Sequence, residues 1–257
     1  MSRILQTAAT LAVAAVLACS SRVDVGKAPA TSATSATSAT SAAAAPARMV
    51  APNTGESHFT NVRQITYGGE NAEAYFSPDG RWLTFQSTRD GRSCDQQFVV
   101  RADGTDLRRV SDGTGKTTCG YFIDGGRRLL YSSTHAVQRE CPPRPDPSAG
   151  YVWGLDPFDI YTSNLDGSNR KALTSYGVYT TEATVSPDGR TIVFTSLKDG
   201  DLDIYTMDVD GGNMRRLTTT PGYDGGAFFS PDGKRIVYRA WHPTGDSLEV
   251  HRNLLAR

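Results

Sequence analysis

The stretch SDGTGKTTCG, residues 111–120, contains the residue types that bind nucleotide phosphates in many enzymes. A phosphate loop requires Gly-x-x-x-x-Gly-Lys-Thr between a strand and a helix, so that backbone amides and the helix N-terminus converge on the phosphate. Counting back from Gly115, the first glycine would be residue 110, which is Val110. The residues after Thr117 read as a strand and a turn. Both the spacing and the context therefore argue against a nucleotide site.

Other signatures of catalysis are missing from the sequence. It contains neither a Gly-x-Ser-x-Gly elbow nor a His-Glu-x-x-His motif, and its four histidines are scattered at positions 58, 135, 242 and 251. We therefore expect no catalytic residues, no metal site and no cofactor. The 27 basic and 27 acidic residues balance, which argues against a nucleic-acid-binding surface. Paired cations near positions 108, 170 and 215 are interpreted as charges that protect exposed edge strands.

Three cysteines, Cys94, Cys119 and Cys141, lie in the part of the chain that should fold. In an oxidising compartment two of them should form a disulfide and leave one thiol. The sequence favours Cys94–Cys119 or Cys119–Cys141, because each of these pairs joins nearby segments. A metal site that combines His135 with these cysteines is the alternative, although no compact ligand spacing supports it.

A repeat organises the chain after residue 58. Its first half occurs as AYFSPDGRWLTFQST from Ala74, ATVSPDGRTIVFTSL from Ala183 and AFFSPDGKRIVYRAW from Ala227, with the degenerate copy GYFIDGGRRLLYSST from Gly120. Its second half occurs as FVVRADGTDLRRVS, YTSNLDGSNRKALT and YTMDVDGGNMRRLT. Ser-Pro-Asp-Gly and Asp-Gly are turn sequences, and the segments around them are rich in β-branched and aromatic residues. Each copy therefore predicts four strands.

Four-stranded repeats of roughly 44 residues have the period of propeller blades. The sequence thus predicts an all-β protein, a β-propeller of four-stranded antiparallel blades at about 70–111, 117–174, 180–218 and, in part, 224–257. NVRQIT, residues 61–66, matches only the fourth strand of the repeat.

The motifs SPDGRWLTF, SPDGRTIVF and SPDGKRIVY resemble the PD40 repeats of TolB-type propellers, and the resemblance covers roughly residues 60–257. It implies a ring of six blades, of which about four are represented. We therefore expect this sequence to be incomplete at its C-terminus relative to the family. One copy departs from the motif, with Ile-Asp-Gly-Gly at 123–126 and an insertion at about 135–155.

The N-terminal residues indicate export. Residues 1–18 have a basic start and an apolar run too short to span a bilayer, as in a signal peptide. The run ends in VLAC, which resembles the lipobox of bacterial lipoproteins and makes Cys19 the expected lipid anchor. Ser20 favours the outer membrane by family analogy. An ordinary signal peptide with an incidental cysteine is the alternative.

Residues 19–57 are expected to form a low-complexity flexible tether, because their central part, residues 28–48, has no hydrophobic period and almost no charge. Together with the folded segment 58–257 they predict a periplasmic protein that reaches the membrane only through its lipid tether.

Loops at the same face of the predicted blades carry the residues that we expect to meet a partner or ligand. These are Asn71, Glu73, His135, Tyr151, Trp153, Glu182, Tyr223, Asp224 and His242. Acidic groups gathered at a propeller mouth favour a cation or a basic partner segment. Solvated loop carboxylates without a ligand are the alternative.

These expectations favour a non-enzymatic, membrane-tethered scaffold for protein interactions in the cell envelope. The resemblance implies the peptidoglycan-associated lipoprotein or Tol-type components as partners, and no nucleic acid. Two alternatives remain open. One is the propeller portion of a secreted peptidase or hydrolase, and the other is a receptor that binds a ligand or cation in the acidic mouth.

Overall fold

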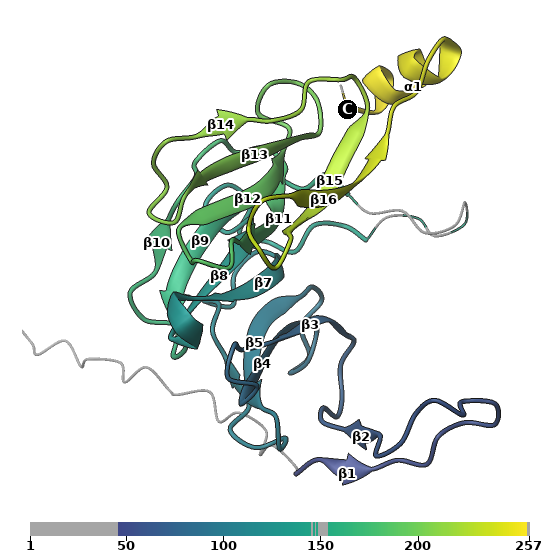
Figure 1. Ribbon diagram of the computed structural model, residues 1–257, viewed down its shortest axis with the longest axis vertical. Helices are drawn as coiled ribbons and strands as arrows, with labels where there is room; N and C mark the ends of the chain where they lie inside the picture. Colours follow the sequence, from purple (N-terminus) through teal and green to yellow (C-terminus); the bar gives the residue numbers. More distant parts are fainter. Residues whose placement is uncertain (1–45, 145, 147, 149–153, 256–257) are drawn as a thin grey trace, which may run out of the picture. The chain divides into compact units, whose positions relative to one another are not determined.

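The computed structural model describes residues 46–144, 146, 148 and 154–255 (Figure 1). Three residues with expected roles, Cys19, Tyr151 and Trp153, lie outside the described residues. The described residues belong to one compact unit. No helix in the part of the chain that the structure describes is long and apolar enough to cross a membrane.

Three antiparallel sheets of four strands follow one another along the chain, each with its strands in sequence order. The first contains β3 (Asn71–Phe76), β4 (Trp82–Ser87), β5 (Gln96–Arg101) and β6 (Arg108–Arg109). The second contains β7 (Thr117–Ile123), β8 (Arg128–Ser133), β9 (Asp159–Asn164) and β10 (Lys171–Ala172). The third contains β11 (Thr180–Val185), β12 (Thr191–Ser196), β13 (Asp203–Asp208) and β14 (Arg215–Arg216). The predicted fold class, four-stranded antiparallel propeller blades, is confirmed.

Two smaller sheets complete the described part of the chain. β15 (Tyr223–Phe229) pairs with β16 (Ile236–Trp241), and α1 (Asp246–Leu255) follows them. β1 (Arg48–Met49) pairs with β2 (Arg63–Gln64), the strand inside NVRQIT. In the degenerate copy of the repeat, a short 3₁₀ helix (Asp124–Gly126) occupies the turn between β7 and β8.

The Ser-Pro-Asp-Gly turns hold the first two strands of a blade together through one hydrogen-bond pattern. In the third blade the Ser186 hydroxyl donates to Asp188 Oδ1 at 2.6 Å, and the Arg190 amide donates to the same oxygen at 3.1 Å. The Thr191 amide donates to Ser186 Oγ at 3.0 Å. The turns at Ser77 and Ser230 repeat these contacts. The aspartate is therefore a structural acceptor that closes each turn.

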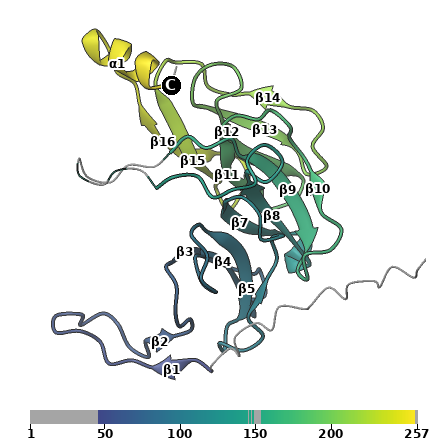
Figure 2. The same ribbon diagram turned by 180° about the vertical axis from the view of Figure 1, so that it is seen from behind.

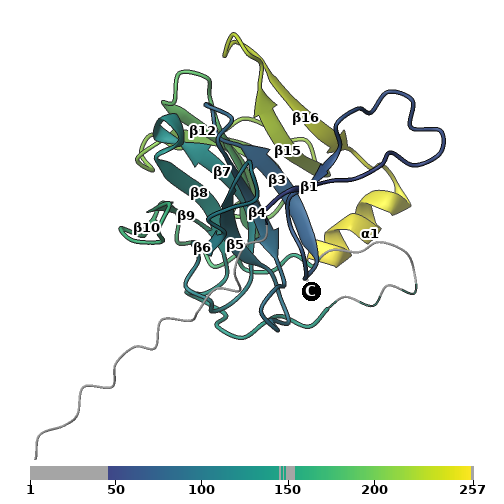
Figure 3. The same ribbon diagram turned by 90° about the horizontal axis from the view of Figure 1, so that it is seen from below.

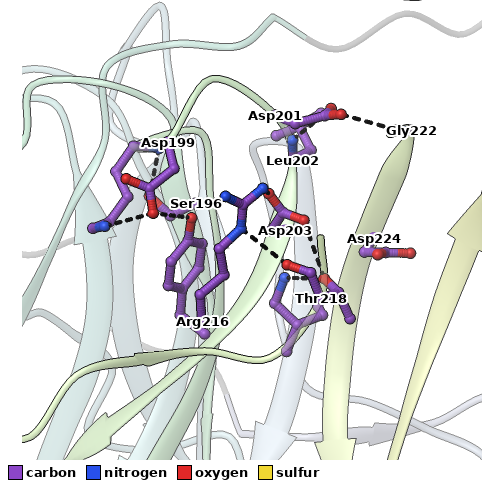
Figure 4. A network of polar contacts seen from close by, with 12 residues as sticks. Ser196, Asp199, Asp201, Leu202, Asp203, Arg216, Thr218, Gly222 and Asp224 are labelled. Atoms are coloured by element: carbon purple, nitrogen blue, oxygen red, sulfur yellow. Dashed lines mark hydrogen bonds and ion pairs between the residues drawn. The ribbon is translucent and has the colours of Figure 1, made fainter. Parts of the chain in front are cut away.

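A second repeated contact joins the third strand of each blade to the segment after the fourth. In the third blade, Thr218 Oγ1 accepts from the Ile204 amide at 2.9 Å and donates to Asp203 (Figure 4). Arg216 also pairs with Asp203, whose side chain is 1% exposed. Ser111 with Gln96 and Thr174 with Asp159 make the equivalent bonds. These buried polar side chains are hydrogen-bonded, as buried polar groups must be.

Apolar side chains pack between neighbouring blades more than within them. The largest cluster joins Ile123, Leu130 and Ile160 of the second blade to Ile192 and Phe194 of the third. A second cluster joins the first and second blades, and a third lies within the first blade. Figure 3 shows β3, β7 and β15 near one another with β6 and β10 further out, and Figure 2 shows β10 and β14 at the outer side. The first strand of each blade therefore faces the centre.

Candidate functional site

Each central strand contains a β-bulge at one equivalent position. The pairing register shifts between Ala72 and Tyr75 in β3, and corresponding shifts occur in β7, β11 and β15. The bulged residue has a left-handed backbone in every case. These residues are Glu73 (φ 51°), Cys119 (φ 54°), Glu182 (φ 57°) and Gly226 (φ 64°). A bulge redirects a side chain without ending the strand, so the four positions turn toward one centre.

The four bulged residues line a common cavity of about 60 Å³. The residue two positions after each bulge also lines it, and three of those residues are aromatic: Tyr75, Tyr121 and Phe228. The ring centroids of Tyr75 and Tyr121 lie 5.5 Å apart, and Phe228 lies 6.1 and 6.4 Å from them. The cavity is thus bounded by aromatic rings and by the two carboxylates of Glu73 and Glu182.

The two carboxylates join neighbouring strands across the centre. Glu73 Oε2 accepts from the Cys119 amide at 3.1 Å, and Glu182 Oε2 accepts from the Gly226 amide at 2.9 Å. Glu182 Oε2 also accepts from the Thr195 hydroxyl at 2.8 Å. A carboxylate at this position therefore binds the bulge amide of the following sheet, which gives each Glu a structural role as well as a charge.

The second blade has Cys119 where its neighbours have glutamate. Ser132 occupies the position that corresponds to Thr195, and Ser132 Oγ has no hydrogen-bond partner among the described residues. Thr181 Oγ1, one residue before Glu182, is likewise unpartnered within the described part, and both residues are at most 1% exposed. The carboxylate that would satisfy such groups is thus missing between the second and third blades.

Burial and the two carboxylates keep the neighbouring acids neutral. Burial, together with Glu73, raises the pKa of the Tyr75 phenol to about 12. Burial followed by Glu73 also raises the pKa of the Cys119 thiol, and burial followed by Glu182 raises the pKa of Tyr179. At neutral pH the Tyr75 and Tyr179 phenols are therefore uncharged, and Cys119 is a thiol rather than a reactive thiolate.

The sequence predicted that Glu73 and Glu182 share a face, and the structure places both on the cavity. It places them inside the central strands rather than in the loops before them. The three aromatic rings that line the cavity, Tyr75, Tyr121 and Phe228, were not among the residues predicted from the sequence. Their signal is the repeat alignment, because all three occupy the same column, two residues after the bulge.

The other expected face residues lie around this centre in separate contacts. Tyr223 reaches Glu182 through its hydroxyl at 3.4 Å and accepts from Arg239 at 3.1 Å. His242 Nε2 contacts Asp224 Oδ1 at 2.9 Å, while Asn71 Oδ1 accepts from Arg89 at 2.8 Å.

His135 lies away from the cavity, on the second blade. Its Nδ1 is 2.7 Å from Ser133 Oγ, and its ring centroid lies 4.5 Å from that of Tyr161. Burial lowers the pKa of His135. No group of three His, Cys, Asp or Glu side chains within the described ranges is arranged to hold a metal ion.

The disulfide differs from both pairings that the sequence favoured. Cys94 bonds Cys141, with Cα atoms 5.6 Å apart, and Cys119 is the free thiol. Cys94 and Cys141 follow the second strands of adjacent blades and meet between those blades. The bulge instead directs Cys119 to the central cavity. Short separation in the sequence therefore did not predict the disulfide pairing, because the repeat places equivalent loops of adjacent blades side by side.

Comparisons with known proteins agree with the fold. Residues 155–253 match the family described as the TolB beta propeller domain, PD40. A solved structure of a TolB-named protein from Agrobacterium tumefaciens superposes with a TM-score of 0.54 at 20% identity, covering 70% of this chain and 58% of that one. The sheets described above are TolB-like propeller blades.

The TolB-like chain also resembles other proteins. A chain of a nidogen/laminin complex superposes with a TM-score of 0.51 at 15% identity, over 67% of this chain and 57% of that one. A 50-residue stretch is 42% identical to an uncharacterized protein of Agrobacterium fabrum, which is 19% of this chain and 16% of the relative. The chain thus spans well under two thirds of the length of these relatives. At these identities the solved structures establish the fold alone.

Proposed function

We propose that this protein is a non-enzymatic scaffold for protein interactions, held at the bacterial envelope on the periplasmic side by a lipid on Cys19. The TolB-like blades support this proposal, as does the lipobox-like VLAC at residues 16–19. The partners that it implies are envelope proteins, such as the peptidoglycan-associated lipoprotein or Tol-type components.

The exposed apolar side chains of β16 are the observation that carries the scaffold role. In each complete blade the second strand pairs on both sides, whereas β16 pairs with β15 alone among the described strands. Its side chains remain open to solvent, with Val237 68%, Trp241 51% and Tyr238 39% exposed. Exposed apolar side chains of this size mark a surface that another segment covers, and in this proposal that segment belongs to an envelope protein.

The polar groups that could suggest an enzyme are engaged in holding the fold. The turn aspartates accept from serine hydroxyls and backbone amides, and Asp159 and Asp203 accept from threonine hydroxyls. The cavity cysteine is a neutral thiol because burial raises its pKa. These contacts favour a binding role over catalysis.

Site-specific photocrosslinking in cells tests the proposal. A photoreactive amino acid at Tyr238 should crosslink an envelope protein, identified by mass spectrometry, and Val237→Lys should abolish that product by placing a charge at the edge. The same reagent at the exposed residue Arg190, in a turn of the third blade, is the matched control and should give no such product. If position 238 captures no envelope protein above the level of position 190, the scaffold proposal is wrong.

The lipid anchor is tested separately by fractionation. Cys19→Ala should move the protein from the membrane fraction to the soluble fraction and abolish incorporation of radiolabelled palmitate. Unchanged membrane association of Cys19→Ala would contradict the anchor while leaving the scaffold role open to the crosslinking test.

A further inference from the structure

We infer that the central cavity is a binding site for a primary ammonium group, such as the end of a lysine side chain. The site is formed by the carboxylates of Glu73 and Glu182 together with the rings of Tyr75, Tyr121 and Phe228. It is separate from the β16 edge, so the inference does not depend on the scaffold role.

The carboxylates of the two lining glutamates retain acceptor capacity. The Cys119 amide occupies Glu73 Oε2, and no described residue donates to Glu73 Oε1. For Glu182, the short bonds converge on Oε2, and Oε1 receives only the Tyr223 hydroxyl at 3.4 Å. Within the described residues neither carboxylate has a lysine or arginine nitrogen within 4.0 Å. Glu73 is exposed and Glu182 is half-buried, and Arg239, which donates to the Tyr223 hydroxyl, is a cation near Glu182. The carboxylate oxygens that accept no short hydrogen bond favour a cationic ligand.

The aromatic rings in the lining favour an ammonium group over a metal ion as the bound cation. The faces of tyrosine and phenylalanine rings attract ammonium groups but do not coordinate metal ions. Calcium takes six to eight oxygen ligands and magnesium prefers six, whereas this cavity offers two carboxylates and no group of three potential ligands in the described part of the chain. An ammonium group has three donors, which match the acceptor capacity left on the two carboxylates.

The size of the cavity restricts the ligand further. Its volume is about 60 Å³, and a single water needs roughly 10–15 Å³ by the same measure. An aminomethyl group with a few waters fits this space, and a bulky ligand does not.

Titration calorimetry on the folded protein tests this inference. We expect n-butylammonium chloride to bind, and Glu182→Gln to weaken that binding at least about tenfold, because a hydrogen bond to a charged group is worth roughly 1.5–3 kcal/mol. Glu70→Gln is the matched control, since Glu70 is exposed and pairs with Arg144 outside this cavity. It should bind n-butylammonium as the unaltered protein does.

Two additions keep the result interpretable. Glu182 also holds the Gly226 amide, so Glu73→Gln is measured beside it, and the melting curves of both variants are recorded. The peptide acetyl-Gly-Lys-Gly-amide distinguishes the source of the ammonium group. Binding of the peptide alone would assign the site to a partner's lysine, and binding of both ligands would assign it to free amines as well.

Three results would overturn the inference. The first is the absence of heat with n-butylammonium and with the peptide. The second is unchanged affinity in folded Glu182→Gln and Glu73→Gln. The third is binding of calcium chloride with no binding of either ammonium ligand. None of them bears on photocrosslinking at Tyr238, so the two proposals fail independently.

Discussion

In each Ser-Pro-Asp-Gly turn, one aspartate accepts the hydrogen bonds that close the turn. Asp79, Asp188 and Asp232 each accept from the serine two positions earlier and from the amide two positions later. The serine hydroxyl, followed by the backbone amide, lowers the pKa of each of these carboxyls below its ordinary value of 3.8. The charged form is therefore the form that stabilises the turn.

The lowered pKa values predict the response to acid. Because the folded pKa lies below the unfolded one, the contribution to stability is complete above about pH 4 and is lost as the pH falls through the folded pKa. Urea midpoints measured from pH 7 to pH 2.5 should fall below about pH 4. The triple variant Asp79→Asn, Asp188→Asn, Asp232→Asn should be less stable at pH 7 and show a shallower fall. An equally steep fall in the variant would contradict this origin.

Gly120 is a second position at which a contact with one neighbouring side chain restricts the residue type. A Cβ atom built there would lie 2.0 Å from the Gln97 amide nitrogen, whereas the other three sheets have alanine at this position. Gly120→Ala should therefore destabilise the protein by about 1–3 kcal/mol in urea unfolding, the usual cost of overpacking.

A double-mutant cycle separates this clash from other effects. Adding Gln97→Ala should recover part of the loss caused by Gly120→Ala, because the clashing amide is removed. Gly226→Ala is the control: its Cβ would meet open space, and its cost comes from the left-handed backbone. Gln97→Ala should leave that cost unchanged. Equal coupling in both cycles would show that the clash at Gly120 is not the cause.

At the scale of elements, the insertion between β8 and β9 is fixed to its neighbour by several contacts. The Cys94–Cys141 disulfide joins it to the segment between β4 and β5, and Lys116 pairs with Asp156 at 3.0 Å. Arg144 reaches Glu70, although both side chains are exposed and such pairs contribute little. The disulfide is thus the main tie between the insertion and the first blade.

Removing the disulfide should loosen the insertion and lower stability. Cys94→Ala with Cys141→Ala should reduce the free energy of unfolding by about 2–4 kcal/mol and speed tryptic cleavage after Arg139. Cys119→Ala is the control, because Cys119 is the free thiol and should leave the cleavage rate unchanged. Similar cleavage rates in the unaltered protein, the double variant and Cys119→Ala would show that the other contacts hold the insertion in place without the disulfide.

At the scale of the whole molecule, stability should vary along the array of blades. The cluster between the second and third blades contains eight buried residues, and the cluster within the first blade contains four. β16 is exposed from Val237 to Trp241. Arrays of repeats are stabilised by their intrinsic and nearest-neighbour terms, so protection should be highest in the middle.

Native-state hydrogen exchange measures this gradient. Amides of β8, β12 and β13 should exchange most slowly, those of β4 and β5 faster, and those of β16 fastest among the blade strands. Phe194→Leu should lower protection mainly in the second and third blades. Uniform protection across the array would mean that it unfolds as one unit.

The repeat made the blades predictable, because Ser-Pro-Asp-Gly and Asp-Gly each encode a turn in a few adjacent residues. The bulges were not predictable, since the left-handed conformation of Glu73 or Cys119 follows from how the strands meet at the centre and not from a local signal. The disulfide was missed for a related reason. The prediction preferred cysteines that are close in the sequence. Cys94 and Cys141 are far apart in the sequence but lie close in space, because they belong to adjacent blades.

The bulges also bear on how such a protein can change over time. The bulged position contributes its side chain to the cavity, while pairing resumes two residues later in every central strand. Glutamate, cysteine and glycine all occupy it within this one chain. The lining of the centre is therefore free to diversify blade by blade under selection for a new ligand, while the strands that carry it keep their pairing.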